Sequence, residues 1–206
     1  MNGFFITLEG IDGAGKSTQA RALATWFEGE GREVVLTREP GGSAGAEEIR
    51  RLLVEGAPDR WSGETETLLF TAARRDHLER VITPALAAGK VVISDRFADS
   101  TRVYQGAARG ELRALVDTLH KLAIQREPDL TLILDMDPDV ALSRGLARAS
   151  GEDRFEEEGA AFQHRLRAGF KALAAEYPSR CRLVDASRPP AEITPDLIAA
   201  TQERLA

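Results

Sequence analysis

The chain contains one cysteine, one asparagine and no long apolar run. Because Cys181 has no second cysteine to pair with, an intramolecular disulfide is excluded, and its setting in "SRCRLVD" favours a buried structural thiol over a nucleophile. No apolar stretch approaches the length of a membrane span, and the opening "MNGFFITLEG" lacks the basic start and the long apolar core of a signal peptide. These absences predict a cytoplasmic protein.

Positive charge is also in deficit, since 27 Lys and Arg face 33 Asp and Glu, for a net charge of -6. A nucleic-acid coat or a polybasic membrane anchor needs a positive excess, so we expect neither a nucleic-acid nor a membrane partner. Local arginine clusters can still bind a small anion. With 206 residues, 43% of them hydrophobic and 29% charged, the chain is expected to form one globular domain over residues 1–206.

Short apolar runs that end in turn residues alternate with segments of helical periodicity. The apolar runs predict strands at 4–9, 33–37, 90–95, 129–137 and 181–187. The periodic segments predict helices at 16–31, 46–56, 64–89, 110–124, 138–149, 160–178 and 190–206. Strands that alternate with helices imply right-handed crossovers and a parallel sheet with helices on both faces. The fold class expected is therefore α/β, with a five-stranded parallel sheet in three layers.

The segment "LEGIDGAGKST" fits the phosphate-loop pattern G-x-x-x-x-G-K-[ST] between a strand and a helix. Such a loop wraps backbone N–H groups around phosphate oxygens, while its lysine reaches the β- and γ-phosphates and its hydroxyl can bind Mg²⁺. The alternative is a glycine-rich turn with a chance lysine, which the agreement of strand, spacing and helix disfavours. A nucleoside triphosphate is expected on Gly10, Ile11, Asp12, Gly13, Ala14, Gly15, Lys16, Ser17 and Thr18.

This loop serves many chemistries, so other features must select among them. A GTPase switch would need an N-K-x-D guanine-binding motif, and the lone asparagine is Asn2. A motor or a helicase would need a much longer chain. The small size and the five expected strands favour a kinase that acts on a small acceptor.

The acceptor is expected beyond the carboxyl ends of the strands, where open parallel sheets bind ligands. The segments there are "TREPGG", "SDRFADSTRVYQGAARG" and "LDMDP". Asp95 can hold Mg²⁺ through water, and Arg96 can bind an acceptor phosphate with two parallel hydrogen bonds. An ordinary surface ion pair between these two residues is the alternative.

Four motifs, "GIDGAGKST", "TREPGG", "DRFADSTRVYQG" and "EDRFEEE", occur in the order and approximate spacing found in bacterial thymidylate kinases. The chain resembles that family over nearly its whole length. The resemblance implies a P-loop nucleoside-monophosphate-kinase fold and transfer of the γ-phosphate of ATP to dTMP, with Mg²⁺, giving dTDP and ADP. It also implies a homodimer with a helical interface.

The resemblance assigns roles to residues of the acceptor site. It places Asp12 near the sugar 3′-hydroxyl, Phe70 on the thymine ring and Arg74 at the base edge, with Arg96 on the acceptor phosphate. Tyr104 would crowd a ribose 2′-hydroxyl. The full set implied to bind the acceptor is Asp12, Arg38, Glu39, Pro40, Arg50, Phe70, Arg74, Arg96, Ser100, Thr101, Tyr104 and Gln105. The segment "DASRPPAE" would border the adenine, largely through backbone groups.

Several of these residues have a structural alternative in the sequence itself. Phe70 follows Leu68 and Leu69, so it could be a core aromatic, and Tyr104 could be ordinary packing. Sequence alone does not say whether Arg74 or Arg75 turns inward. The histidines, His77, His120 and His164, lack the spacing of metal ligands, and surface or core positions are expected for them.

Some family members carry an arginine directly after the phosphate-loop aspartate, where this chain has Gly13. Positive charge must then come from elsewhere, because phosphoryl transfer spreads negative charge over equatorial oxygens. The chain resembles the bacterial variant whose lid, here at about 144–155, supplies Arg144, Arg148 and Arg154, with Arg154 expected to matter most. Closing the lid would exclude water. A solvated, charged helix surface is the alternative.

Two other functions stay open at this point. One is a nucleoside or nucleoside-monophosphate kinase of another specificity, because the same architecture serves several acceptors. The other is a regulatory switch that senses or hydrolyses ATP. A switch has no use for an acceptor-phosphate site, so Arg96 and the "REP" turn favour the kinase.

Overall fold

The computed structural model describes residues 2–57, 60–108, 112–141 and 159–206. It contains a five-stranded sheet of order β2-β3-β1-β4-β5, and every neighbouring pair is parallel. The strands are β1 (Phe4–Glu9), β2 (Val34–Arg38), β3 (Val91–Asp95), β4 (Leu130–Asp135) and β5 (Cys181–Asp185). These bounds confirm the predicted strands to within two residues at each end, and the parallel sheet is confirmed as well.

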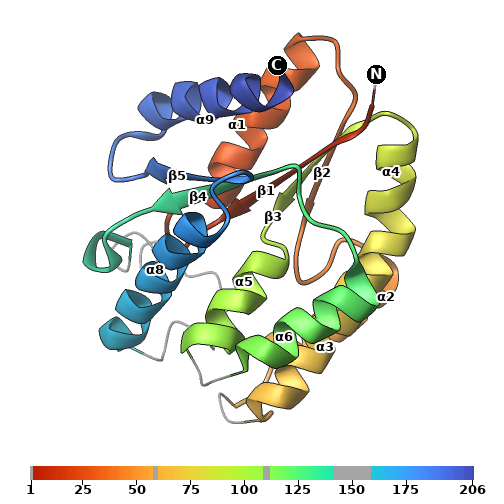
Figure 1. The fold of residues 1–206 in the computed structure, drawn as a ribbon, viewed down its shortest axis with the longest axis vertical. Coiled ribbons are helices and arrows are strands. Elements are labelled where there is room, and N and C mark those ends of the chain that lie inside the picture. The colour runs from red at the N-terminus through yellow and green to blue at the C-terminus, as the bar shows by residue number, and fades with distance from the viewer. Residues whose placement is uncertain (1, 58–59, 109–111, 142–158) are drawn as a thin grey trace.

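Helices cover both faces of the sheet (Figure 1). Helices α1 (Lys16–Gly29) and α9 (Pro190–Leu205) lie together on one face. The other face carries α3 (Gly63–His77), α6 (Arg113–Leu119) and α8 (Gly159–Glu176). The arrangement confirms the three layers expected from the alternation of strands and helices.

The central strand β1 is buried along its whole length, as its continuous apolar run predicts. Its side chains alternate between the two faces. Ile6 belongs to the apolar cluster that includes Leu23 of α1, whereas Phe5 packs with Leu78 and Ile82 on the other face. The sheet edges are more open, because β2 and β5 have a neighbouring strand on one side alone.

The expected helix at 64–89 is interrupted. It consists of α3, a π-helical turn η1 (Leu78–Ile82) and α4 (Thr83–Ala87). Similarly, α6 continues into a π-helical turn η3 (His120–Ile124). Helix α2 (Ala44–Val54) begins two residues before its expected start. The helix expected from 138 is helical over 138–141, and its remainder lies outside the described residues.

One helix was missed by sequence reasoning. The segment after β3 forms α5 (Ala98–Val103) and a π-helical turn η2 (Tyr104–Ala108). Its sequence, "ADSTRV", is short and contains Asp, Ser, Thr and Val, which have low helix propensity, so local preference gives no helical signal. All six residues of α5 are buried, which indicates that tertiary contacts hold the helix in place. In the part of the chain that the structure describes, no helix is long and apolar enough to cross a membrane.

Candidate active site

A cavity of about 500 Å³ lies beyond the carboxyl ends of β1, β2 and β3. Its wall comes from the loops after these strands and from α2, α3, α5 and η2. All twelve residues expected to bind the acceptor line it: Asp12, Arg38, Glu39, Pro40, Arg50, Phe70, Arg74, Arg96, Ser100, Thr101, Tyr104 and Gln105. Val54 and Phe97 line it too, although sequence reasoning did not single them out. Both are apolar residues inside helical or turn segments, where no local signal distinguishes a cavity wall from the core.

The phosphate loop connects β1 to α1, and its glycines have backbone conformations that side chains rarely adopt. Gly13 has a φ of 80°, and a Cβ there would lie 2.4 Å from the Ala141 carbonyl oxygen. A side chain at this position would therefore clash with the segment after β4. This contact gives a physical reason why the loop carries no arginine directly after Asp12.

Lys16 begins α1 and is buried beside the cavity. Its Nζ donates a hydrogen bond to the Ile11 carbonyl oxygen at 2.8 Å and lies 3.8 Å from the Asp12 carboxylate. Burial and the positive charge of Arg96 lower the pKa of Lys16 to about 8. The ammonium group therefore loses part of its charge just above neutral pH unless an anion binds beside it.

Ser17 and Asp95 both line the cavity and contact each other. The Ser17 hydroxyl donates to Asp95 Oδ2 at 2.5 Å, so the two expected Mg²⁺-binding oxygens are adjacent. Mg²⁺ prefers oxygen ligands and usually keeps several waters or phosphate oxygens, which makes two protein oxygens a suitable set. Across the described residues, no group of three or more His, Cys, Asp and Glu side chains could hold a metal ion.

Arg96 has a positive φ of 71°, which is uncommon outside glycine, and its guanidinium group lies inside the cavity wall. It donates to the Gly10 carbonyl oxygen at 3.1 Å, Ser100 Oγ at 3.0 Å and Tyr104 Oη at 3.2 Å. It also pairs with the Asp12 carboxylate. These contacts fix the guanidinium in the cavity wall, where an acceptor phosphate is expected.

Asp12 faces Arg96 and Lys16, and its second oxygen accepts a hydrogen bond from Tyr104 Oη at 3.1 Å. Burial alone would raise the pKa of Asp12, but the charges of Arg96 and Lys16 outweigh it and lower the pKa to about 2. The side chain is therefore ionised at neutral pH. It can accept a hydrogen bond from a sugar hydroxyl, but it would repel a phosphate.

Glu9 was missed by sequence reasoning. It ends β1 and is fully buried, accepting hydrogen bonds from Phe97 N at 2.8 Å and Ser100 Oγ at 2.5 Å. Burial and the negative charge of Asp99 raise the pKa of Glu9 to about 8. The contacts hold the turn that carries Arg96. An acidic residue at the end of an otherwise apolar strand was the available signal.

Arg74, and not Arg75, turns inward from α3. Its Nε donates to Glu39 Oε2 at 2.7 Å, and its Nη2 donates to the Phe97 carbonyl oxygen at 3.1 Å and Thr101 Oγ1 at 2.9 Å. Arg75 instead points outward and pairs with Glu79 of η1, the turn that follows α3. The structure thus settles the question that the sequence left open.

His77 does not line the cavity, but it contacts Glu39, which does. Its Nδ1 lies 3.0 Å from Glu39 Oε1, and its Nε2 lies 2.8 Å from Thr37 Oγ1. The side chain is fully buried, which confirms a core position. The chain of contacts from Thr37 through His77 and Glu39 to Arg74 links β2 to α3.

The aromatic residues Phe70 and Tyr104 are at least partly buried and also line the cavity. Phe70 is half-buried and lines the cavity, so it is not simply a core aromatic. Tyr104 is buried and packs edge to face on Phe162 at 6.2 Å between ring centroids, while its hydroxyl reaches Asp12. Packing and a site contact are therefore both present at Tyr104.

Arg38 and Arg50 frame the "REP" turn. Arg38 is largely exposed and pairs with Glu47 at 3.2 Å, whereas Arg50 donates to the Pro40 carbonyl oxygen at 2.6 Å. The three expected lid arginines, Arg144, Arg148 and Arg154, lie outside the described residues.

Cys181 is buried, as expected, and burial raises the pKa of its thiol to about 12.

A second cavity of about 240 Å³ lies on the other side of the phosphate loop, next to α9. Its lining includes Thr18, Gln19, Pro190 and Ile193 together with the loop backbone. Gln19 donates to the Pro190 carbonyl oxygen at 2.9 Å and thereby joins α1 to α9. Pro190 belongs to the segment expected to border the adenine.

Comparisons with known proteins agree on one family. The thymidylate kinase family model matches residues 8–197. The chain is 69% identical to the thymidylate kinase of Jannaschia sp. (98% of this chain, 97% of that protein) and 70% identical to that of Dinoroseobacter shibae (96% and 95%). The crystal structure of thymidylate kinase from Ehrlichia chaffeensis matches 98% of this chain and 100% of its own, with 36% identity and a TM-score of 0.79. The chain belongs to the thymidylate kinase family.

Proposed function

We propose that the chain phosphorylates dTMP to dTDP with ATP as the phosphoryl donor. A phosphate oxygen of dTMP would attack the γ-phosphorus of ATP, and the bond from that phosphorus to the β–γ bridging oxygen would break to release ADP. The observation that carries the proposal is one cavity lined both by Lys16 and Ser17 of the phosphate loop and by Arg96 on the acceptor side. Membership of the thymidylate kinase family supports the same reaction.

The donor side would be built from the phosphate loop. Its backbone N–H groups and Lys16 would hold the β- and γ-phosphates, and their negative charge would restore the full charge of Lys16. Ser17 and Asp95 would hold Mg²⁺, which when bound neutralises charge on the phosphates. The second cavity, beside Pro190, would take the adenine.

On the acceptor side, separate side chains would bind the phosphate, the sugar and the base of dTMP. Arg96 would bind the phosphate of dTMP, exchanging its pairing with Asp12 for the stronger anion, while Asp12 would accept the sugar 3′-hydroxyl. Phe70 would stack on thymine and Arg74 would contact the base edge. The ring of Tyr104 would leave no room for a ribose 2′-hydroxyl.

We further infer that Arg144, Arg148 and Arg154 stabilise the charge of the transferring phosphoryl group. The inference rests on the family resemblance and on Gly13. Because a side chain at Gly13 would clash with the Ala141 backbone, the loop itself has no place for an added arginine.

The test is ADP release from Mg-ATP with dTMP, dUMP, dCMP, dGMP, dAMP or UMP as acceptor, and with no acceptor. We expect fast turnover with dTMP, weaker turnover with dUMP and little with UMP, because one thymine methyl contributes ~1–3 kcal/mol of discrimination. Preference for another acceptor would overturn the roles given to Phe70, Arg74 and Tyr104. ADP release that ignores every acceptor would indicate the regulatory switch instead.

The proposal also includes a homodimer of single-domain subunits in the cytoplasm. Its support is the exposure of large apolar side chains on two helical segments, α3 and η3. Leu68 of α3 is 53% exposed and Leu122 of η3 is 69% exposed. Isolated exposed leucines are common, so the oligomeric state needs its own measurement.

A further inference from the structure

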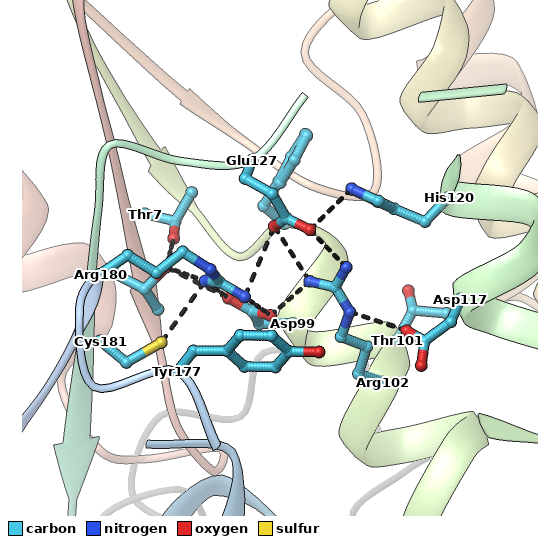
Figure 2. Close-up of polar contacts among 12 residues, drawn as sticks. Thr7, Asp99, Thr101, Arg102, Asp117, His120, Glu127, Tyr177, Arg180 and Cys181 are labelled. Atoms are coloured by element: carbon cyan, nitrogen blue, oxygen red, sulfur yellow. Dashed lines mark hydrogen bonds and ion pairs between the residues drawn. The ribbon is translucent and has the colours of Figure 1, made fainter. Parts of the chain in front are cut away.

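Helix α5 contributes residues to the large cavity and also to a cluster of polar and charged side chains, which Figure 2 shows. Ser100 and Thr101 of α5 line the cavity, whereas Asp99 and Arg102 of the same helix belong to the cluster. The cluster, here called the Asp99 network, consists of Asp99, Arg102, Glu127, Thr131 and Arg180. One short helix thus carries both site residues and network residues.

Asp99 lies at the centre of this network and is 1% exposed. Its Oδ1 accepts hydrogen bonds from Arg102 Nη1 at 2.8 Å and Arg180 Nη2 at 2.9 Å. Its Oδ2 accepts from Arg180 Nη1 at 2.5 Å and Thr131 Oγ1 at 3.1 Å. Burial alone would raise the pKa of Asp99, but the hydrogen bonds and charges of the two arginines lower it. The carboxylate is therefore ionised, and four donors saturate it.

The partners of Asp99 come from elements that are far apart in the sequence. Thr131 belongs to strand β4, next to the central strand β1. Arg180 directly precedes β5, with its guanidinium carbon 4.5 Å from the centre of the Tyr177 ring. Arg102 extends the network to Glu127, with donor–acceptor distances of 2.6 and 3.1 Å. The network therefore attaches α5 to the sheet and to the connection that follows α8.

This attachment matters because α5 has little to hold it in place by itself. Together with η2, which continues it, the helical segment has eleven residues, six in α5 and five in η2, which is below the length of about 12–15 at which isolated helices begin to be stable in water. Within the described residues, no side chain caps its N-terminus. Buried ion pairs with several hydrogen bonds are directional, so they define one position more sharply than apolar packing does.

We propose that Asp99 is a positioning residue of the acceptor site: held by Arg102 and Arg180, it keeps α5 where Ser100, Thr101 and Tyr104 face the acceptor. The proposal rests on the proposed function of that site. Asp99 does not line the cavity, so it acts through the residues that follow it in α5 and η2. Its loss weakens the binding of dTMP more than the binding of ATP, because Lys16 and Ser17 of the phosphate loop belong to α1 and not to α5 or η2.

The first test is Asp99→Asn, which keeps the side-chain shape and removes the charge. Arg102 and Arg180 keep Glu127 in this variant, but they lose the carboxylate of α5 itself. Helix α5 then shifts, and we expect the KM for dTMP to rise about tenfold or more while the KM for ATP stays within about twofold. The melting temperature is measured on the same preparations.

The matched control is Asp117→Asn. Asp117 contacts the same Arg102, at 3.1 Å, but it lies on α6 and is 40% exposed. Because Arg102 keeps Asp99 and Glu127 in this variant, we expect both KM values to stay within about twofold of wild type. A tenfold rise in the KM for dTMP here would contradict the specific role of Asp99, because Asp117 lies outside the Asp99 network.

A second variant separates positioning from stability. In the double variant Asp99→Leu/Arg180→Met, apolar groups replace the ion pair, an exchange that often preserves stability. We expect a melting temperature above that of Asp99→Asn together with a KM for dTMP that is still raised. If Asp99→Asn fails to fold, this variant alone decides the question.

Three results would overturn the proposal. The first is a folded Asp99→Asn with an unchanged KM for dTMP, and the second is a rise in both KM values together. The third is a double variant with wild-type KM values, which would leave Asp99 a purely structural role. Wild-type turnover is measured first. If wild type shows no turnover with dTMP, the proposed function is contradicted, and the role of Asp99 with it. The three results named above contradict the role of Asp99 alone.

Discussion

Phosphate binding is expected to change the charge of Lys16 more than that of any other residue of the site. Its pKa in the free protein is about 8, lowered by burial and by Arg96. Phosphate binding needs the charged form, so raising the pH through 8 removes the charge that holds ATP. We therefore predict that kcat/KM for ATP falls above an apparent pKa of about 8.

The control for this prediction is kcat/KM for dTMP measured at saturating ATP. Under that condition the bound phosphates keep Lys16 charged, so kcat/KM for dTMP should show no fall near pH 8. Glu9 also has a pKa of about 8, so the profile is repeated with Glu9→Gln, which should keep the alkaline fall. A kcat/KM for ATP that is constant up to pH 9.5 would contradict the assignment to Lys16.

Glu9 makes a prediction about stability. Its pKa is raised from 4.5 to about 8, so the folded protein binds more protons than the unfolded chain between these values. The free energy of unfolding therefore falls as the pH rises from about 4.5 to 8. Gln does not titrate, so Glu9→Gln escapes this loss. We expect the melting temperature of the variant minus that of wild type to be larger at pH 8.5 than at pH 5.5. The difference should be about 2–4 °C for each kcal/mol of unfolding free energy that wild type loses between these pH values.

Calorimetry at the two pH values measures this difference directly. The substitution also replaces one oxygen that accepts a hydrogen bond from Phe97 N or Ser100 Oγ, which costs stability at every pH. This cost is the same at both pH values, so it cancels when the two are compared. An offset that is identical at both pH values would show that Glu9 is ionised in the folded protein throughout.

At the scale of single residues, the sequence predicted the cavity-facing side chains better than the side chains that support them. Most of the residues expected to bind the acceptor belong to recognisable motifs, and all of them line one cavity. Glu9, His77 and Asp99 have no comparable signal, because their importance depends on partners that are distant in the sequence. His77, for example, contacts Glu39 from a position 38 residues away.

At the scale of elements, the lid carries the next prediction. Arg154→Ala is expected to lower kcat by about 10³–10⁵, since a positioned arginine stabilises charge that develops in the transition state. The measurement is kcat with saturating dTMP and ATP for Arg144→Ala, Arg148→Ala and Arg154→Ala. Less than about a tenfold loss in each variant would contradict the lid assignment.

A matched control is available in α8. Arg165 lies outside both cavities, with its guanidinium carbon 5.5 Å from the centre of the Phe162 ring, and Arg165→Ala should leave kcat within about threefold of wild type. An equal loss in this control would indicate a general effect of surface charge.

The strands and long helices were predictable because their hydrophobic periodicity is local and continuous. The buried β1 is an uninterrupted apolar run, and α1 and α9 have clear apolar faces. Helix α5 was not predictable in this way, because its residues have low helix propensity and its position depends on Asp99 and Arg102. The π-helical turns after α3 and α6 are likewise set by packing, which propensity does not describe.

At the scale of the whole molecule, the homodimer is the open prediction. Light scattering coupled to size exclusion should give twice the 22.4 kDa of one chain. Replacing both Leu68 and Leu122 by Glu should yield monomers, because charges would be buried at the interface. Leu36→Glu, on the exposed edge strand β2, is the control and should leave the mass unchanged. A wild-type mass of one chain would contradict the dimer.

The sheet order is also a property of the whole chain that local patterns left undetermined. Alternation predicted a parallel sheet, but the order β2-β3-β1-β4-β5 depends on which crossovers form. This order brings the ends of β1, β2 and β3 to one cavity. The phosphate loop and Arg96 therefore lie close together although they are far apart in the sequence.

The most direct test of the central claim is to follow the γ-phosphate itself. Purified protein is incubated with Mg²⁺, dTMP and ATP labelled in the γ-phosphate, and the nucleotides are separated by chromatography. The account predicts that the label appears in dTDP in an amount equal to the ADP formed, and that Lys16→Met abolishes the transfer. Label found in inorganic phosphate, with none in dTDP, would contradict it.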